Sequence, residues 1–142
     1  MTTIDFYTHC NDRLDVVARL VPKAWSRHGT VRVLTPDEGT TARLGALLWT
    51  LAPTSFLPHC RLKSPLASAT PIVVDHALEH EGAGAVLINL NPAPPPFFAR
   101  FERLIEVIGA DETDAATGRE RWRFYSQRGY TLTSHNLSHL QG

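Results

Sequence analysis

The sequence has no excess of charge of either sign and very little cysteine. Its 14 basic residues balance 14 acidic ones, so nothing attracts nucleic acid globally and any recognition of an anion must be local. The 2 cysteines, Cys10 and Cys60, form no CxxC pair. Their spacing favours reduced thiols in a cytosolic protein over a disulfide or a metal site.

Long apolar runs are also missing. No segment approaches the roughly 20 apolar residues that a membrane span needs. The first residues include Asp5 and Asp12 and lack the basic start and apolar stretch of a signal peptide. We therefore expect a soluble, cytoplasmic protein without a membrane partner, folded as a single domain over residues 1–142.

The segments that are present alternate between strand-like and helix-like patterns. We expect strands at 3–7, 31–34, 72–74, 85–90, 105–108 and 130–133, and helices at 12–28, 36–51, 97–104 and 111–128. Pro22 lies inside the first helix and is expected to kink or restart it. This order predicts an α/β fold, a three-layer domain with a largely parallel sheet.

Between Ala52 and Pro71 the proline content rises and periodicity is lost, which predicts a long surface loop. Loops of this length are often functional. Phe56 is its most notable residue, because a large apolar side chain between Pro53 and Pro58 fits neither a helix nor a strand pattern.

A glycine-rich phosphate loop is absent, although many α/β domains bind nucleotides. The turn after the first expected strand, residues 8–12, contains no glycine. Gly82 and Gly84 precede a strand, whereas a dinucleotide fingerprint follows a strand and opens a helix. The sequence therefore predicts no nucleotide and no other cofactor.

Metal and nucleophile patterns are weak. His76 and His80 have the helical spacing of two zinc ligands, with Asp75 and Glu79 beside them, but their segment is short and no further ligand is placed. We interpret it as a solvated connection and expect no metal. Two further histidine–cysteine pairs have no supporting motif and are interpreted as structural, so no catalytic residue is predicted: His9–Cys10 and His59–Cys60.

Arginines and aromatic residues interleave near the C-terminus. On a helix, Arg119, Trp122 and Arg123 share one strip, while Phe124 and Tyr125 suit the core. Arginine forks bind carboxylates or phosphates, and tryptophan supplies apolar area, so the block is typical of a binding site more than of a catalytic one. From the residues alone, a solvated face with acidic neighbours is the alternative.

The order and spacing of several motifs resemble the chi subunit family of the bacterial DNA polymerase III holoenzyme, part of the clamp-loader assembly. The resemblance covers nearly the whole chain. The motifs are Asp5-Phe6-Tyr7, Arg32-Val33-Leu34, Leu48-Trp49, Ser55-Phe56-Leu57-Pro58-His59, Arg119-Glu120-Arg121-Trp122, and Gly129-Tyr130 with Leu132. The family fold is similar to nucleotide-binding domains but serves protein contacts.

The resemblance implies two interfaces. The acidic C-terminal tail of single-stranded DNA-binding protein, which ends in aspartates and Pro-Phe, would bind Arg119, Trp122 and Arg123, with Ile108 lining the pocket for the terminal phenylalanine. The psi subunit would contact Trp49 and Phe56, although core packing is an equal interpretation for Trp49.

This sequence departs from the family pattern at two positions of the tail site. Ala115 stands where a lysine often adds to the basic site, and Ser126 where an arginine can lie. Both differences imply weaker electrostatic attraction, for which Arg121 or Arg128 would be possible substitutes.

The function implied by the resemblance is a non-enzymatic replication adaptor, which would link the clamp loader through psi to single-stranded DNA-binding protein and meet nucleic acid only indirectly. A direct single-stranded nucleic-acid-binding module is the alternative, because arginine and aromatic side chains also hold single strands. A nucleotide-dependent enzyme is the third possibility.

Overall fold

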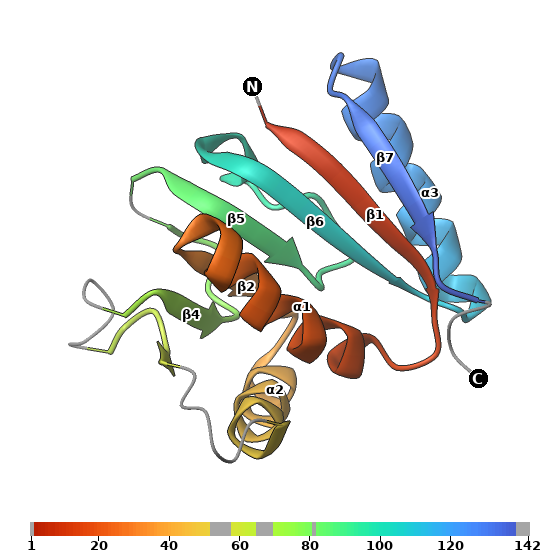
Figure 1. Cartoon of the computed structure of the whole chain (residues 1–142). Coiled ribbons are helices and arrows are strands. Elements are labelled where there is room, and N and C mark those ends of the chain that lie inside the picture. The colour runs from red at the N-terminus through yellow and green to blue at the C-terminus, as the bar shows by residue number, and fades with distance from the viewer. Residues whose placement is uncertain (1, 52–57, 65–69, 81, 139–142) are drawn as a thin grey trace.

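The computed structural model describes residues 2–51, 58–64, 70–80 and 82–138 (Figure 1). In these residues, a 7-stranded parallel sheet has the order β3-β4-β2-β5-β6-β1-β7. The strands are β1 (Thr3–Cys10), β2 (Val31–Leu34), β3 (His59–Cys60), β4 (Ile72–Asp75), β5 (Gly84–Asn89), β6 (Phe101–Gly109) and β7 (Leu132–Asn136). The helices are α1 (Arg13–His28), α2 (Glu38–Leu51), α3 (Glu112–Gln127) and the 3-10 turn η2 (Phe98–Arg100).

Helices cover both faces of the sheet, which confirms the three-layer α/β fold. Figure 1 shows α1 and α2 on one face and α3 behind the other. Side chains alternate across a strand, and β6 follows this rule. Ile105 and Val107 belong to the apolar core under α1 and α2, whereas Leu104 and Ile108 belong to the core under α3. Glu106 has the same parity as Leu104 and therefore faces α3.

The prediction of a helix over residues 97–104 is wrong. Only Phe98–Arg100 forms a 3-10 turn, and β6 already begins at Phe101. Apolar residues at Phe97, Phe98, Phe101 and Leu104 fit a helical period, but the strand satisfies its backbone by pairing with β5 and β1 along its length. Long-range pairing therefore overrides the local pattern.

The helix does not restart at Pro22, one of the two outcomes expected there, because α1 runs unbroken from Arg13 to His28. A proline in a helix interior costs about 3 kcal/mol. Val21 and Ala24, on either side of it, are buried in the core, and this packing offsets the cost. The helix ends at Gly29, which has a φ of 89° and donates its N–H to the carbonyl of Trp25.

The loop expected between Ala52 and Pro71 contains a short edge strand. His59 and Cys60 form β3 and pair in parallel with Ile72 and Val73 of β4. Two residues are too few to show an alternating pattern in the sequence. Phe56 lies outside the described residues.

Candidate functional site

A buried carboxylate fixes the orientation of α3 on the sheet. Glu106 of β6 is fully buried and accepts hydrogen bonds from Arg121 Nε at 3.0 Å and from the Tyr125 hydroxyl at 2.6 Å. Asn89 of β5 also donates to it, with Nδ2 at 3.0 Å from each carboxylate oxygen. Arg121 Nη1 donates to the carbonyl of Pro92 at 2.8 Å. The helix is therefore joined to the centre of the sheet.

Burial and charge act in opposite directions on this carboxyl group. Burial raises the pKa of Glu106, and Arg121, Tyr125 and Asn89 oppose that increase by charge and hydrogen bonding. Tyr125 has its pKa raised by burial and by the Glu106 charge, so it stays a neutral donor. The side of α3 that packs on the sheet thus includes Arg121 beside Tyr125.

Gly118 brings α3 close to β6. It is buried, and a Cβ atom at this position would meet the Ile108 side chain at 3.0 Å. A larger residue would therefore push the helix away from the strand. The close approach leaves Ile108 packed beneath the helix and forms the apolar side of a cavity.

This cavity has a volume of about 410 Å³ and lies between the carboxyl-terminal parts of β1 and β6 and the stretch of α3 from Glu112 to Trp122. Its wall includes Phe6 and His9 of β1, Ile108 of β6, and Glu112, Arg119 and Trp122 of α3. We call it the α3 cavity. An apolar cavity with a few charged groups at its edge is typical of a ligand site.

The structure brings three of the four residues predicted for the tail site together at the α3 cavity. Ile108 is buried, Trp122 is half-buried with its ring edge-to-face on Phe6 at 5.1 Å, and Arg119 is exposed. Arg123 is exposed one turn beyond Arg119 and does not line the cavity. Trp122 is therefore less exposed than its position on a solvent-facing strip predicts.

The two substitute cations suggested by the sequence are already engaged within the protein. Arg121 is 2% exposed and bound to Glu106, so the suggestion that it contacts an external ligand is wrong. The Arg128 guanidinium lies 3.6 Å from the ring centroid of Phe124 and donates to the carbonyl of the same residue. Phe124, expected in the core, is half-buried at its edge.

Sequence reasoning missed two residues of the α3 cavity. Glu112 forms an ion pair with Arg119, with Oε1 and Nη2 3.3 Å apart, at the exposed edge. His9 was interpreted as structural, but it lines the cavity beside Thr8. The only available signal was its place after a predicted parallel strand, because the carboxyl ends of such strands often carry binding residues.

A second surface lies at the other end of the sheet. Trp49 of α2 is 62% exposed, and its ring meets His59 of β3 edge-to-face at 5.7 Å. A shallow cavity of about 350 Å³ separates α2 from β3, with Trp49, His59 and Arg61 on its wall. Phe56, the other residue predicted here, is not in the described part of the chain.

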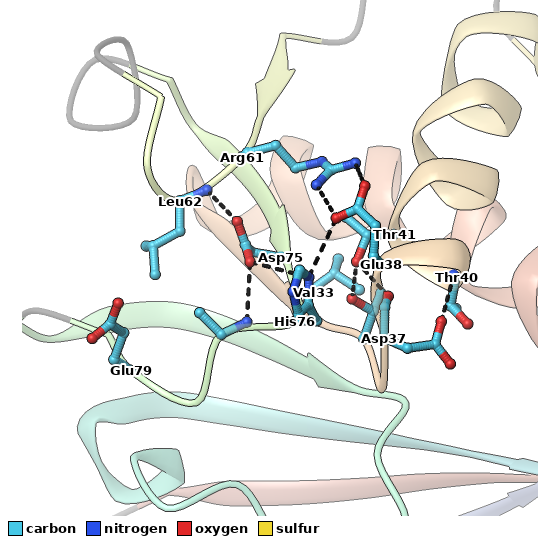
Figure 2. Close-up of polar contacts among 12 residues, drawn as sticks. Val33, Asp37, Glu38, Thr40, Thr41, Arg61, Leu62, Asp75, His76 and Glu79 are labelled. Atoms are coloured by element: carbon cyan, nitrogen blue, oxygen red, sulfur yellow. Dashed lines mark hydrogen bonds and ion pairs between the residues drawn. The ribbon is translucent and has the colours of Figure 1, made fainter.

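Ionic contacts fix this second surface (Figure 2). Arg61 binds Glu38 of α2 through both guanidinium nitrogens, each at 2.8 Å, and the hydrogen bond lowers the pKa of Glu38. Asp75, at the end of β4, accepts from the backbone N–H groups of Leu62 and Ala77 at 2.9 and 3.0 Å. The segment after β3 is therefore tied both to α2 and to β4.

The histidines considered as metal ligands are used separately. His76 lies between Asp75 and Glu38, whereas the His80 ring packs on Phe101 at 4.7 Å. Within residues 2–51, 58–64, 70–80 and 82–138, no group of three or more metal-ligating side chains could hold an ion. No helix of the described residues has the length and apolar character needed to cross a membrane.

The chain is similar to known proteins of one family. The model of the family described as DNA polymerase III chi subunit, HolC, matches residues 1–133. The DNA polymerase III subunit chi of Pseudomonas aeruginosa is 28% identical over 144 residues, which cover 99% of this chain and 100% of that protein. The proteins of the same name from Haemophilus influenzae and Escherichia coli are 23% and 21% identical, over 87% and 84% of this chain and 86% and 82% of theirs.

A solved structure supports the fold alone. The C-terminal domain of a Saccharomyces cerevisiae Dbp5 variant, bound to Gle1 and IP6, has a TM-score of 0.64 with 11% sequence identity. The match covers 95% of this chain and 90% of that one. At this identity only the architecture is comparable, and fold similarity carries no functional conclusion.

Proposed function

The chain belongs to the DNA polymerase III chi subunit family, and from this membership we propose that it links the clamp loader, through psi, to the C-terminal tail of single-stranded DNA-binding protein. The family is an accessory, non-catalytic part of the replication polymerase. In this proposal the protein works in the cytoplasm, needs no cofactor and meets DNA only through its protein partners.

The observation that carries the proposal is the α3 cavity with Arg119 at its edge. A tail that ends in phenylalanine needs an apolar site for the ring and a cation for the terminal carboxylate. Ile108 and Trp122 offer the apolar area, and the exposed Arg119 guanidinium offers a planar fork for the carboxylate. The chemistry of the cavity therefore matches the chemistry of the tail end.

Arg123 would meet the acidic residues that precede the terminal phenylalanine. It lies one turn after Arg119 on the same exposed strip of α3. Side chains four residues apart on a helix are neighbours, so an extended acidic peptide would pass one arginine and then the other. Attraction between such exposed charges is screened by salt.

The second surface would bind psi. Tryptophan is among the residue types enriched where a few side chains dominate the binding energy of a protein interface. Trp49 combines 62% exposure with an adjacent shallow cavity whose wall is held in place by the Arg61–Glu38 pair. An apolar side chain of the partner would fit beside the indole.

The test is a titration of the protein with an N-acetylated peptide of aspartates followed by Pro-Phe, and in parallel with a single-stranded oligonucleotide. We expect the peptide to bind, binding to weaken as salt is added, and Arg119→Ala to weaken it about tenfold. A peptide without its last phenylalanine should bind much more weakly. Equal binding of the shortened peptide would contradict the cavity as its site.

Binding of the oligonucleotide but not of the peptide would instead support a direct nucleic-acid-binding module. The control for Arg119→Ala is Arg19→Ala. Arg19 is an exposed arginine on α1 that pairs with Asp15, as Arg119 pairs with Glu112. Because Arg19 does not line the α3 cavity, its loss should leave peptide binding unchanged.

A further inference from the structure

The charged groups on the wall of the α3 cavity cancel one another unless a histidine is protonated. Its titratable residues are His9, Glu112 and Arg119. With a neutral imidazole, the negative Glu112 balances the positive Arg119. With an imidazolium, the wall has a net positive charge. Protonation of one residue thus changes the cavity from neutral to attractive for an anion.

An irregularity in β1 places His9 on this wall. Successive side chains of a strand point to opposite faces, so His9 should face away from Phe6 and Thr8. The register of β1 with β6 shifts between Tyr7 and Cys10, and His9 has a φ of 61°. Such bulges redirect side chains, and Phe6, Thr8 and His9 all line the α3 cavity.

The backbone of His9 is strained, which points to a purpose for its position. A residue other than glycine held at positive φ costs about 1–3 kcal/mol, and such residues concentrate at functional sites. The imidazole is also oriented, because Nδ1 lies 2.9 Å from the Thr8 hydroxyl. A hydroxyl both donates and accepts hydrogen bonds, so Thr8 is a suitable partner for either protonation state of the ring.

We propose that His9 belongs to the tail site and contributes a positive charge there only when its imidazole is protonated. The acidic peptide then binds more tightly to the protonated form. This inference rests on the proposed tail-binding function. His9 would also replace the positive charge that the tail site lacks at Ala115, which lines the same cavity. Arg121 is not available for this purpose, because it is buried against Glu106.

Among the described residues of the neighbouring elements, the nearest other histidine is engaged elsewhere on β1: His135 of β7 is the register partner of Tyr7, and its Nε2 lies 3.2 Å from Asp5 Oδ1. Burial raises the pKa of the adjacent Cys10 thiol to about 11, so it stays neutral. The end of β6 contributes Ile108, Gly109 and Ala110 to the cavity, none of them titratable. On β7, the register partner of Thr8 is Asn136. From α1 and α3, Arg13 and Asp114 form an ion pair at 3.4 Å, and Asp114 also accepts from the Gly109 N–H. Among the described residues, Glu112 and Arg119 are the other charged groups on the cavity wall.

The experiment measures binding of the N-acetylated acidic peptide at pH 6 and pH 8, at constant ionic strength. Acetylation removes the one peptide group that would titrate in this range, because aspartates and terminal carboxylates are ionised throughout. The test variant is His9→Asn, because asparagine tolerates positive φ better than most residues. The control is His28→Asn, an exposed histidine at the opposite end of the sheet.

We expect the wild-type protein and His28→Asn to bind about threefold to fivefold more tightly at pH 6 than at pH 8, the range for a partly exposed charge pair. His9→Asn should bind equally at both pH values and match the wild type at pH 8. A pH-independent wild type, or a pH dependence retained in His9→Asn, would overturn the inference. Absence of peptide binding at either pH would instead overturn the proposed function.

Discussion

The hydroxyl of Tyr125 donates a hydrogen bond of 2.6 Å to the carboxylate of Glu106, and this bond joins the last turns of α3 to the middle of β6. Arg121, one turn earlier on the helix, binds the other oxygen of the same carboxylate. Two contacts from one face of the helix to one buried acid fix its rotation. As a result, Arg119 and Trp122 line the α3 cavity, and Arg123 is exposed one turn beyond Arg119.

Arg121→Met should destabilise the protein strongly, by about 3–5 kcal/mol, because it leaves Glu106 buried without its cation. Arg121 opposes the rise that burial causes in the pKa of Glu106, so its loss raises that pKa further. A carboxyl with a raised pKa in the folded state is destabilising where it must ionise. The deficit should therefore be largest at neutral pH and shrink as pH falls toward the ordinary range of glutamate.

Urea unfolding of the wild type and of Arg121→Met at several pH values measures this dependence. Adding Glu106→Gln to Arg121→Met should recover part of the stability at neutral pH, since the buried charge is then gone. If the deficit of Arg121→Met stayed constant with pH, the ion pair would not be its cause.

Gly118→Ala should weaken both stability and tail binding. The added Cβ would lie 3.0 Å from the Ile108 side chain, so Ile108 or the helix must shift by a few tenths of an ångström and the wall of the α3 cavity changes shape. We expect a loss of about 1–3 kcal/mol in the free energy of unfolding. Gly45→Ala on α2 is the matched control, because nothing lies within 4 Å of its added Cβ and alanine favours a helix interior. It should stabilise the protein, and thermal unfolding distinguishes the two signs.

Glu112→Gln should tighten binding of the acidic peptide about twofold to threefold, because it removes a like charge from the cavity edge and releases Arg119 from its ion pair. Glu120→Gln removes the same charge from an exposed position of α3 outside the cavity wall. It should have a smaller effect. Equal gains from both variants in a peptide titration would show that only the overall charge of the helix matters.

Trp49→Ala should abolish or strongly weaken binding of psi while leaving the free energy of unfolding nearly unchanged, because the side chain is 62% exposed. Leu78→Ala is matched to it, since Leu78 is also 62% exposed and does not line the cavity beside Trp49. Co-purification of each variant with psi, together with thermal unfolding, is the measurement. Retention of psi by Trp49→Ala would remove Trp49 from the interface.

The fold could be predicted from the sequence where local signals and packing agree. Asp111 caps α3 by accepting from the backbone N–H of Asp114, and Gly129 follows the end of the helix with a φ of 82°. The local sequence therefore indicates where this helix begins and ends. The boundary of β6 could not be predicted in this way. Its aromatic residues fit two periodicities, and only pairing with distant strands decides between them.

The candidate site was predictable only in part, for a related reason. Helical spacing groups Arg119, Trp122 and Arg123, but it does not show that Arg121 finds a buried acid on a distant strand. His9 is harder still. The shift of register in β1 between Tyr7 and Cys10 turns the His9 side chain to the cavity, and no pattern in the neighbouring sequence predicts this shift.

The order of the strands also has a consequence for synthesis of the chain. β1 is made first, but it lies between β6 and β7, which come last, and the α3 cavity needs both β1 and α3. A growing chain on the ribosome therefore has no complete α3 cavity until α3 has emerged. Such non-local pairing slows folding, and a product of translation that ends before α3 would lack the α3 cavity.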